Sequence, residues 1–259
     1  MAEGKCIWCL RDTSDGHLEH IIPVAVGGID DLSLPGSVVC KACNNGLAHL
    51  DRAVADEYDM LAFMARVPGR KGKSPAVRGR GNFVATIEPT GPTMTFNMER
   101  FAVTAHDGTL AGPYRARSRN VNAKLQIEGS VGKVSFTQQF GSGPKFVRGI
   151  TKIAFSYFAY MQDHETAREP KYDAIRQFVL KGIGVRHAML IGCDDRKYQC
   201  GPASLLPFEN GQYAVTFRIG PVTFVVDLSE HESLMPAFKL EMQKTYGVNG
   251  WTTLPVELS

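Results

Sequence analysis

The chain has 259 residues, of which 44% are hydrophobic and 21% charged, and its formal net charge is +3. This composition is typical of a folded globular protein and excludes a largely disordered chain, and no stretch is apolar enough to span a membrane. The charge is too small to establish nucleic-acid binding. Because Met1 to Cys6 contain no apolar stretch of the kind found in signal peptides, we expect a cytoplasmic protein with no membrane partner.

Near the N-terminus, four cysteines form two C-x2-C pairs: Cys6, Cys9, Cys40 and Cys43. A Zn2+ ion prefers four tetrahedral thiolate or imidazole ligands, and each pair can supply two of them. The alternatives are buried thiols, or two disulfides in a secreted protein. In a reducing compartment we predict a structural zinc ion, with Cys193 and Cys200 as free thiols.

After the second cysteine pair, the spacing of apolar residues predicts a helix. They recur every three or four positions from Leu47 to Met64, so the helix is expected to begin near Cys43. Asn44 then lies at its N-terminal end, where exposed amide groups favour anions such as phosphate.

The stretch from Arg66 to Arg80 is basic and rich in glycine and proline, with no acidic residue. It is either a solvated linker or a loop that follows a phosphate backbone, and both can be true. The candidate nucleic-acid contacts within it are Arg70, Lys71, Lys73, Arg78 and Arg80.

Beyond residue 80, short alternating runs predict antiparallel strands, followed by two helices and further strands. The expected strands are 82–87, 93–98, 101–105, 123–127, 133–140, 188–191, 213–219 and 222–228, and the expected helices are 146–162 and 172–181. The sequence therefore predicts an α+β protein. Its expected parts are an N-terminal domain over 1–66, a basic linker over 67–81, and a larger α+β domain with antiparallel strands over 82–259, for which target recognition is one candidate role.

The helix expected over 146–162 has apolar residues on one face, which is typical of a core helix. Three cations in this region, Arg148, Lys152 and Arg176, are either part of that packing or contacts to DNA.

Between the two cysteine pairs lies the segment Glu19-His20-Ile21-Ile22-Pro23, followed by Gly27-Gly28, and the second pair runs directly into Asn44. Hydrolysis of a phosphodiester requires a base to deprotonate water and a cation to stabilise the developing charge. Together these residues resemble the HNH endonuclease family, in the subgroup whose ββα-metal unit is held by a four-cysteine structural zinc. The resemblance covers about the first quarter of the chain.

The resemblance implies a role for each matching residue. His20 is the general base, Glu19 is a ligand of a catalytic Mg2+ or Mn2+ ion, and Asn44 is the ligand supplied by the helix. If Asn45 faces the metal instead, His49 joins it as a ligand one turn later; otherwise His49 is a surface histidine. The implied partner is DNA.

The sequence departs from the family at one position. The family commonly has an asparagine before the second cysteine pair that orients the base, whereas residues 32–39 contain none. Asp30, Asp31, Ser33 or a backbone carbonyl could orient His20 instead.

Three functions are consistent with these residues. The first is a metal-dependent DNA endonuclease, the second a catalytically inactive nucleic-acid-binding module derived from one, and the third a zinc-stabilised protein-interaction domain. The first two predict salt-sensitive binding of nucleic acid and the third predicts none. Since one ββα site cuts one strand, double-strand cleavage would require a homodimer or sequential nicking. Residues 145–155 and 172–179 show a weaker resemblance to the latter part of uncharacterised bacterial HNH proteins, which implies no chemistry. We expect a bacterial or phage-encoded protein.

Overall fold

The computed structural model divides into two compact units, and each is described by itself. The first unit contains residues 1–55 and 141–259, and the second contains residues 56–140. The structure describes residues 4–13, 16–29, 31–65, 67, 77–78, 83–88, 91–96, 105–106, 109–110, 114–117, 121–128, 131–138, 141, 143–192, 198–208, 211–246 and 251–254. Among these residues, no helix combines the length and the apolar character that a membrane span needs.

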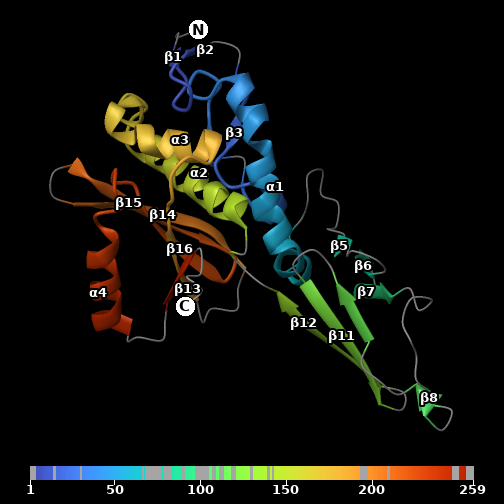
Figure 1. The fold of residues 1–259 in the computed structure, drawn as a ribbon. Helices are drawn as coiled ribbons and strands as arrows, with labels where there is room; N and C mark the ends of the chain where they lie inside the picture. The colour runs from blue at the N-terminus through green and yellow to red at the C-terminus, as the bar shows by residue number, and fades with distance from the viewer. Residues whose placement is uncertain are drawn as a thin grey trace. The chain divides into compact units, whose positions relative to one another are not determined.

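The first unit begins with two very short hairpins and a long helix (Figure 1). Strand β1 (Gly4–Lys5) pairs with β2 (Asp12–Thr13), and β3 (Glu19–His20) pairs with β4 (Ser33–Leu34), both antiparallel. A 3-10 helix, η1 (Val24–Val26), lies between β3 and β4. Helix α1 (Lys41–Met64) follows, so β3, β4 and α1 form the expected ββα arrangement.

Helix α2 (Pro144–Met161) is the centre of this unit. Pro144 occupies its first turn, where the missing amide hydrogen has no cost, and every residue from Gly149 to Ala159 is buried. The Trp8 ring, from the first cysteine loop, lies 5.2 Å from that of Phe155. On the side of the sheet, Tyr157 lies 5.8 Å from Phe217, again between ring centroids. Because α2 is buried on all sides, it packs against both the N-terminal segment and the C-terminal sheet.

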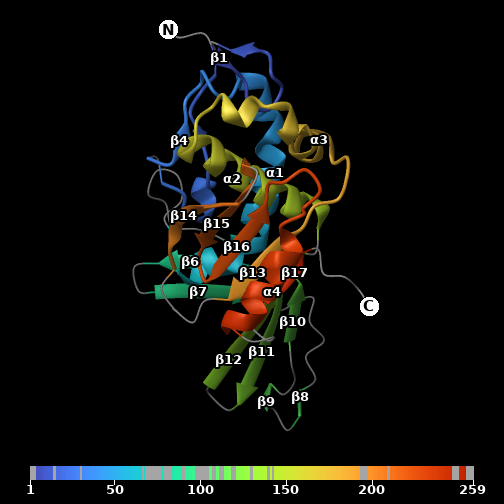
Figure 2. The ribbon, with the colours of Figure 1, turned by 90° about the vertical axis from the view of Figure 1, so that its left-hand side faces the viewer.

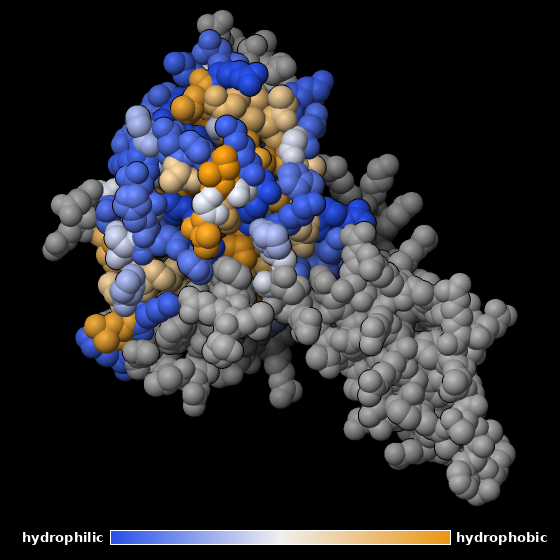
Figure 3. Space-filling model, in the orientation of Figure 1, coloured by the Kyte–Doolittle hydropathy of each residue, from blue (hydrophilic) through white to orange (hydrophobic). Residues whose placement is uncertain are grey.

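Figures 1 and 2 show α2 against a five-stranded antiparallel sheet of order β14-β15-β16-β13-β17. Its strands are β13 (Ala188–Gly192), β14 (Cys200–Pro207), β15 (Tyr213–Ile219), β16 (Val222–Asp227) and β17 (Trp251–Leu254). The remaining helices of the unit are η4 (Thr166–Arg168), η5 (Pro170–Tyr172), α3 (Asp173–Lys181) and α4 (Met235–Tyr246). On the face drawn in Figure 3, hydrophilic residues cover most of the described surface, with small hydrophobic patches between them.

The second unit consists of the end of α1 and antiparallel strands. Three small sheets have the orders β5-β6-β7, β8-β9 and β10-β11-β12. Their strands are β5 (Val77–Arg78), β6 (Phe83–Glu88), β7 (Gly91–Phe96), β8 (Ala105–His106), β9 (Thr109–Leu110), β10 (Tyr114–Arg117), β11 (Val121–Glu128) and β12 (Val131–Gln138).

The mixed α+β class with antiparallel sheets is confirmed. The expected helices at 43–64, 146–162 and 172–181 correspond to α1, α2 and α3 within a few residues. Several elements had no sequence prediction, among them β10, β14, α4 and β17. Of the strand expected over 101–105, only Ala105 lies within the described residues.

The two units do not follow the expected order of 1–66, 67–81 and 82–259. Residues from 141 onward pack with the first 55 residues, and the second unit is inserted between them. The physical reason is α2, whose opposite sides contact the N-terminal segment and the C-terminal sheet. Periodicity showed that this helix is apolar, but it cannot show which segments cover it.

Two helix glycines give a matched test of this packing. A methyl group at residue 149 would lie 2.6 Å from Cγ2 of Val54 and 3.0 Å from the carbonyl oxygen of Leu50, whereas one at residue 46 would meet nothing within 4 Å. We expect Gly149→Ala to destabilise the protein by about 1–3 kcal/mol through overpacking. Gly46→Ala should stabilise it by about 0.5–1 kcal/mol, because alanine is the better helix former. Urea denaturation measures both, and equal effects of the two substitutions would contradict the close approach of α2 to α1.

Candidate functional site

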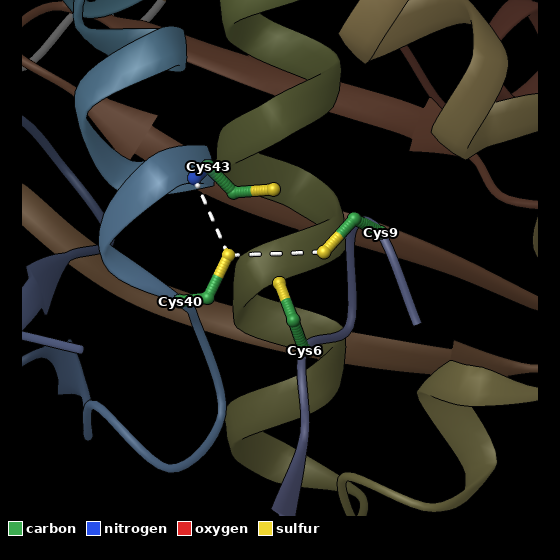
Figure 4. Close-up of side chains that lie close together, drawn as sticks. All are labelled: Cys6, Cys9, Cys40 and Cys43. Atoms are coloured by element: carbon green, nitrogen blue, oxygen red, sulfur yellow. Dashed lines mark hydrogen bonds between the residues drawn. The ribbon is translucent and has the colours of Figure 1, made fainter. Parts of the chain in front are cut away.

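Four cysteine sulfurs gather where the first loop meets the start of α1 (Figure 4). Cys6 and Cys9 come from the turn after β1, while Cys40 and Cys43 lie at the start of α1. All four sulfur atoms lie within 4.8 Å of one another, and those of Cys9 and Cys40 are 3.7 Å apart.

This geometry fits zinc. A tetrahedral Zn2+ ion with Zn–S bonds of about 2.3 Å places its sulfurs about 3.8 Å apart. The backbone amide of Cys43 also donates to the sulfur of Cys40 across 3.4 Å, as outer contacts to metal-bound sulfur do. The four cysteines are therefore suited to hold one structural zinc ion.

The thiols of this cluster differ in acidity. A hydrogen bond from Cys43 lowers the pKa of Cys6 to about 4. The same hydrogen bond, followed by burial, raises the pKa of Cys43 far above its usual range. Four neighbouring thiolates repel one another, so all four become ionised only when a positive charge lies between them.

Removal of one sulfur ligand tests this site. We expect Cys40→Ser to lose the bound zinc and to unfold at lower denaturant concentration, because zinc-binding free energy is folding free energy in such sites. Metal analysis by mass spectrometry and urea denaturation measure the two effects. Cys200→Ser is the matched control, since the Cys200 sulfur donates to the carbonyl of Val26 and lies outside the cluster. Equal zinc content in both variants would contradict the assignment.

The two residues of β3 lie in different environments. The side chain of Glu19 is 3% exposed, whereas that of His20 is half-buried. Strand pairing places Glu19 opposite Leu34 and His20 opposite Ser33. Residues directly opposite in an antiparallel pair lie within side-chain reach of each other. Of the candidates that could orient His20, Ser33 is thus a cross-strand neighbour, Asp31 is exposed, and Asp30 lies outside the described residues.

On α1, Asn44 rather than Asn45 faces the strand. The amide nitrogen of Asn44 donates to the carbonyl of Leu18, next to Glu19, across 3.4 Å. Asn45 is exposed, and the exposed His49 donates from Nδ1 to the carbonyl of Gly46 across 2.8 Å. Asn44 therefore lies beside the segment that carries Glu19, whereas Asn45 and His49 lie on the exposed surface of α1.

A buried cation that sequence analysis did not connect with the site contacts Glu19. The ammonium group of Lys152, on α2, is fully buried and forms an ion pair with Oε1 of Glu19. It also donates to Oδ1 of Asp51, on α1, across 2.7 Å. Lys152 therefore ties strand β3, helix α1 and helix α2 together. Its charge was visible in the sequence, but no pattern linked it to residues more than 100 positions away.

The two carboxyl groups of this triad stabilise the ammonium group between them. Burial by itself lowers the pKa of Lys152, but the charges of Asp51 and Glu19 outweigh burial and raise this pKa above its usual value. Burial raises the pKa of Glu19, against the lowering effect of the Lys152 charge. The lysine is thus held as an ammonium ion between two carboxyl groups.

The other two cations considered for DNA contact are also used within the fold. Arg148 donates to the carbonyl of Val179 across 2.6 Å. Arg176 is 3% exposed and binds Asp173 together with the carbonyl of Ala167. In the basic stretch, Arg78 lies in β5, and the other candidates, Arg70, Lys71, Lys73 and Arg80, lie outside the described residues.

The side-chain types of Glu19 and Asn44 are ones that a hard divalent ion prefers. Mg2+ and Mn2+ prefer oxygen ligands, and Mg2+ is commonly held by one or two carboxylates together with water and substrate phosphates. Glu19 and Asn44 can supply one carboxylate and one amide oxygen. Lys152 occupies one of the two carboxylate oxygens of Glu19, so a ligand role for the other is compatible with the ion pair. Among the described residues, the four cysteines are the only group of three or more His, Cys, Asp or Glu side chains close enough to hold a metal ion.

A comparison with protein families decides the identity of this segment. Residues 6–59 match the HNH endonuclease family model. The match begins at the first zinc-site cysteine and ends within α1, so it contains β3, β4 and the cysteine cluster. The HNH resemblance is thereby confirmed for this segment, and it indicates a nuclease-type function and a nucleic-acid substrate. No curated protein and no solved structure matches the chain.

The triad around Lys152 can be tested by a double-mutant cycle. Lys152→Met keeps the side-chain volume but leaves Glu19 without its buried partner, so we expect a loss of about 3–5 kcal/mol in the free energy of unfolding. Glu19→Gln combined with Lys152→Met should recover part of this loss, because no unpaired buried carboxylate remains at residue 19. Urea denaturation gives the four free energies. Strictly additive effects would contradict the ion pair.

Proposed function

We propose that the protein is a metal-dependent HNH endonuclease that hydrolyses phosphodiester bonds in DNA. The observation that carries the proposal is the family match over residues 6–59, since it coincides with a ββα arrangement whose strand bears Glu19-His20 and whose helix bears Asn44. The four-cysteine site supports it, because a structural zinc ion would hold this arrangement rigid.

In this proposal His20 accepts a proton from the attacking water. Its half-buried position in β3 is compatible with contact to a substrate, and Ser33, opposite in β4, is the candidate to orient its ring. A general base of this kind contributes about 100- to 10,000-fold to a rate.

Glu19 and Asn44 would hold Mg2+ or Mn2+ beside the base. A bound divalent ion supplies positive charge that stabilises the developing negative charge on the phosphate and on the leaving oxygen. Lys152 would fix the carboxylate of Glu19, and Asp51 would hold the ammonium group of Lys152 in place. Lys152 is therefore proposed as a positioning residue.

A catalytically inactive nucleic-acid-binding module is the second candidate. Two observations favour it: the pairing of Glu19 with a fully buried lysine, and the absence of asparagine from residues 32–39. It predicts binding of DNA without cleavage under any divalent-ion condition.

A supercoiled-plasmid assay at low salt separates the two candidates. With Mg2+ or Mn2+, we expect the wild-type protein to nick or linearise the plasmid and His20→Ala to lose at least about 100-fold in rate. His231→Ala is the matched control, because this histidine is 84% exposed. Omitting the divalent ion should abolish cleavage while metal analysis still finds zinc. Undiminished cleavage by His20→Ala would exclude the assigned base, and DNA binding without cleavage by the wild-type protein would favour the inactive module.

A further inference from the structure

In the second unit, the sheet β10-β11-β12 separates basic residues from apolar ones. Antiparallel partners share a face, and successive residues along a strand alternate between faces. The register pairs Arg115 with Lys124 and Lys124 with Ser135, while Gln126 pairs with Lys133. Together with Arg117, two positions from Arg115, these residues belong to one face. That face therefore carries four basic residues.

The composition of the two faces differs sharply. Besides its four basic residues, the first face has amide or hydroxyl residues at positions 122, 126, 135 and 137, one acidic residue, Glu128, and one apolar residue, Val131. The opposite face contains Leu125, Ile127, Val134 and Phe136. The register thus assigns most of the polar and charged residues of these strands to one face and most of the apolar residues to the other.

The first unit offers a contrast. The strands of its five-stranded sheet contain one basic residue, Arg218, and one acidic residue, Asp227. Solubility alone does not explain why basic residues concentrate on one face of the three-stranded sheet while the larger sheet has almost none.

The register also contains an unfavourable pair. Arg115 lies directly opposite Lys124, and like charges in that position destabilise a sheet. An anion bound beside them would offset the repulsion. The pairing therefore points to a ligand with closely spaced negative charges.

We propose that the basic face of β10-β11-β12 binds the phosphate backbone of duplex DNA. Arginine, lysine, amide and hydroxyl groups supply most protein contacts to phosphate, and such contacts position a duplex without reading its sequence. The four basic residues lie on three adjacent strands about 4.8 Å apart, so the face is about 10 Å wide. The inference rests on the proposed function and assigns the second unit the task of holding the substrate.

Fluorescence anisotropy with a labelled duplex tests the proposal without requiring cleavage. All proteins carry His20→Ala and retain zinc, and binding is measured at several salt concentrations. The test variant changes Arg115, Arg117, Lys124 and Lys133 to Gln. We expect its affinity at low salt to fall at least tenfold, with a slope of log affinity against log salt that is shallower by about 0.9 for each phosphate that the variant no longer neutralises.

Two matched variants control for total charge and for folding. The first changes Lys145, Lys171, Lys181 and Lys244 to Gln, which removes the same charge from exposed positions of the first unit and should leave binding within about twofold of the starting protein. The second exchanges arginine and lysine at the four positions of the basic face and should retain the salt slope. If the quadruple Gln variant does not fold, as judged by circular dichroism, Lys124→Gln alone should still lower the slope.

The outcomes separate this inference from the proposed function. Equal loss of affinity in the two quadruple Gln variants, or no loss in either, would overturn the assignment of the basic face. With His20 intact, the four basic-face substitutions can also be tested for cleavage. If this protein cleaves plasmid as well as the wild type does at all salt concentrations, the inference fails while the nuclease function stands. If the protein neither binds nor cleaves DNA, both proposals fail.

Discussion

The four-cysteine cluster is the constraint on which the rest of the candidate site depends. Strands β3 and β4 have only two residues each, which is too short for a stable sheet in isolation. The cluster brings the loop at Cys6 and Cys9 to the start of α1 at Cys40, and the segment with Glu19 lies in the chain between them. Closing this loop through sulfur ligands would restrict the chain on both sides of these short strands.

Lys152 extends this constraint to the C-terminal half. A buried ammonium group carries a large desolvation penalty, which is offset only when charged partners surround it closely. Glu19 and Asp51 are such partners, and they come from β3 and α1, whereas Lys152 comes from α2. The geometry of the HNH segment is thus coupled to the core helix and, through Tyr157 and Phe217, to the C-terminal sheet.

The two units of the chain are suited to different tasks. The first unit builds the candidate hydrolytic site from its N-terminal segment and supports that site with α2. The second unit is inserted between these parts and contains the basic face of β10-β11-β12. In the proposed nuclease, residues around His20 perform the chemistry, while phosphate contacts made by the inserted unit raise the local concentration of substrate.

The sequence by itself determined the local features: the cysteine pairs, the HNH resemblance around His20, the helix that carries Asn44, and the mixed α+β class. Each depends on spacing within a short stretch, which periodicity and motif reading detect. The tertiary structure decided that residues after 141 pack with the N-terminal segment, that Lys152 pairs with Glu19, and that the basic residues of β10-β11-β12 share a face. These features depend on contacts between distant positions and on strand register, where a slip of one residue would move every side chain to the other face.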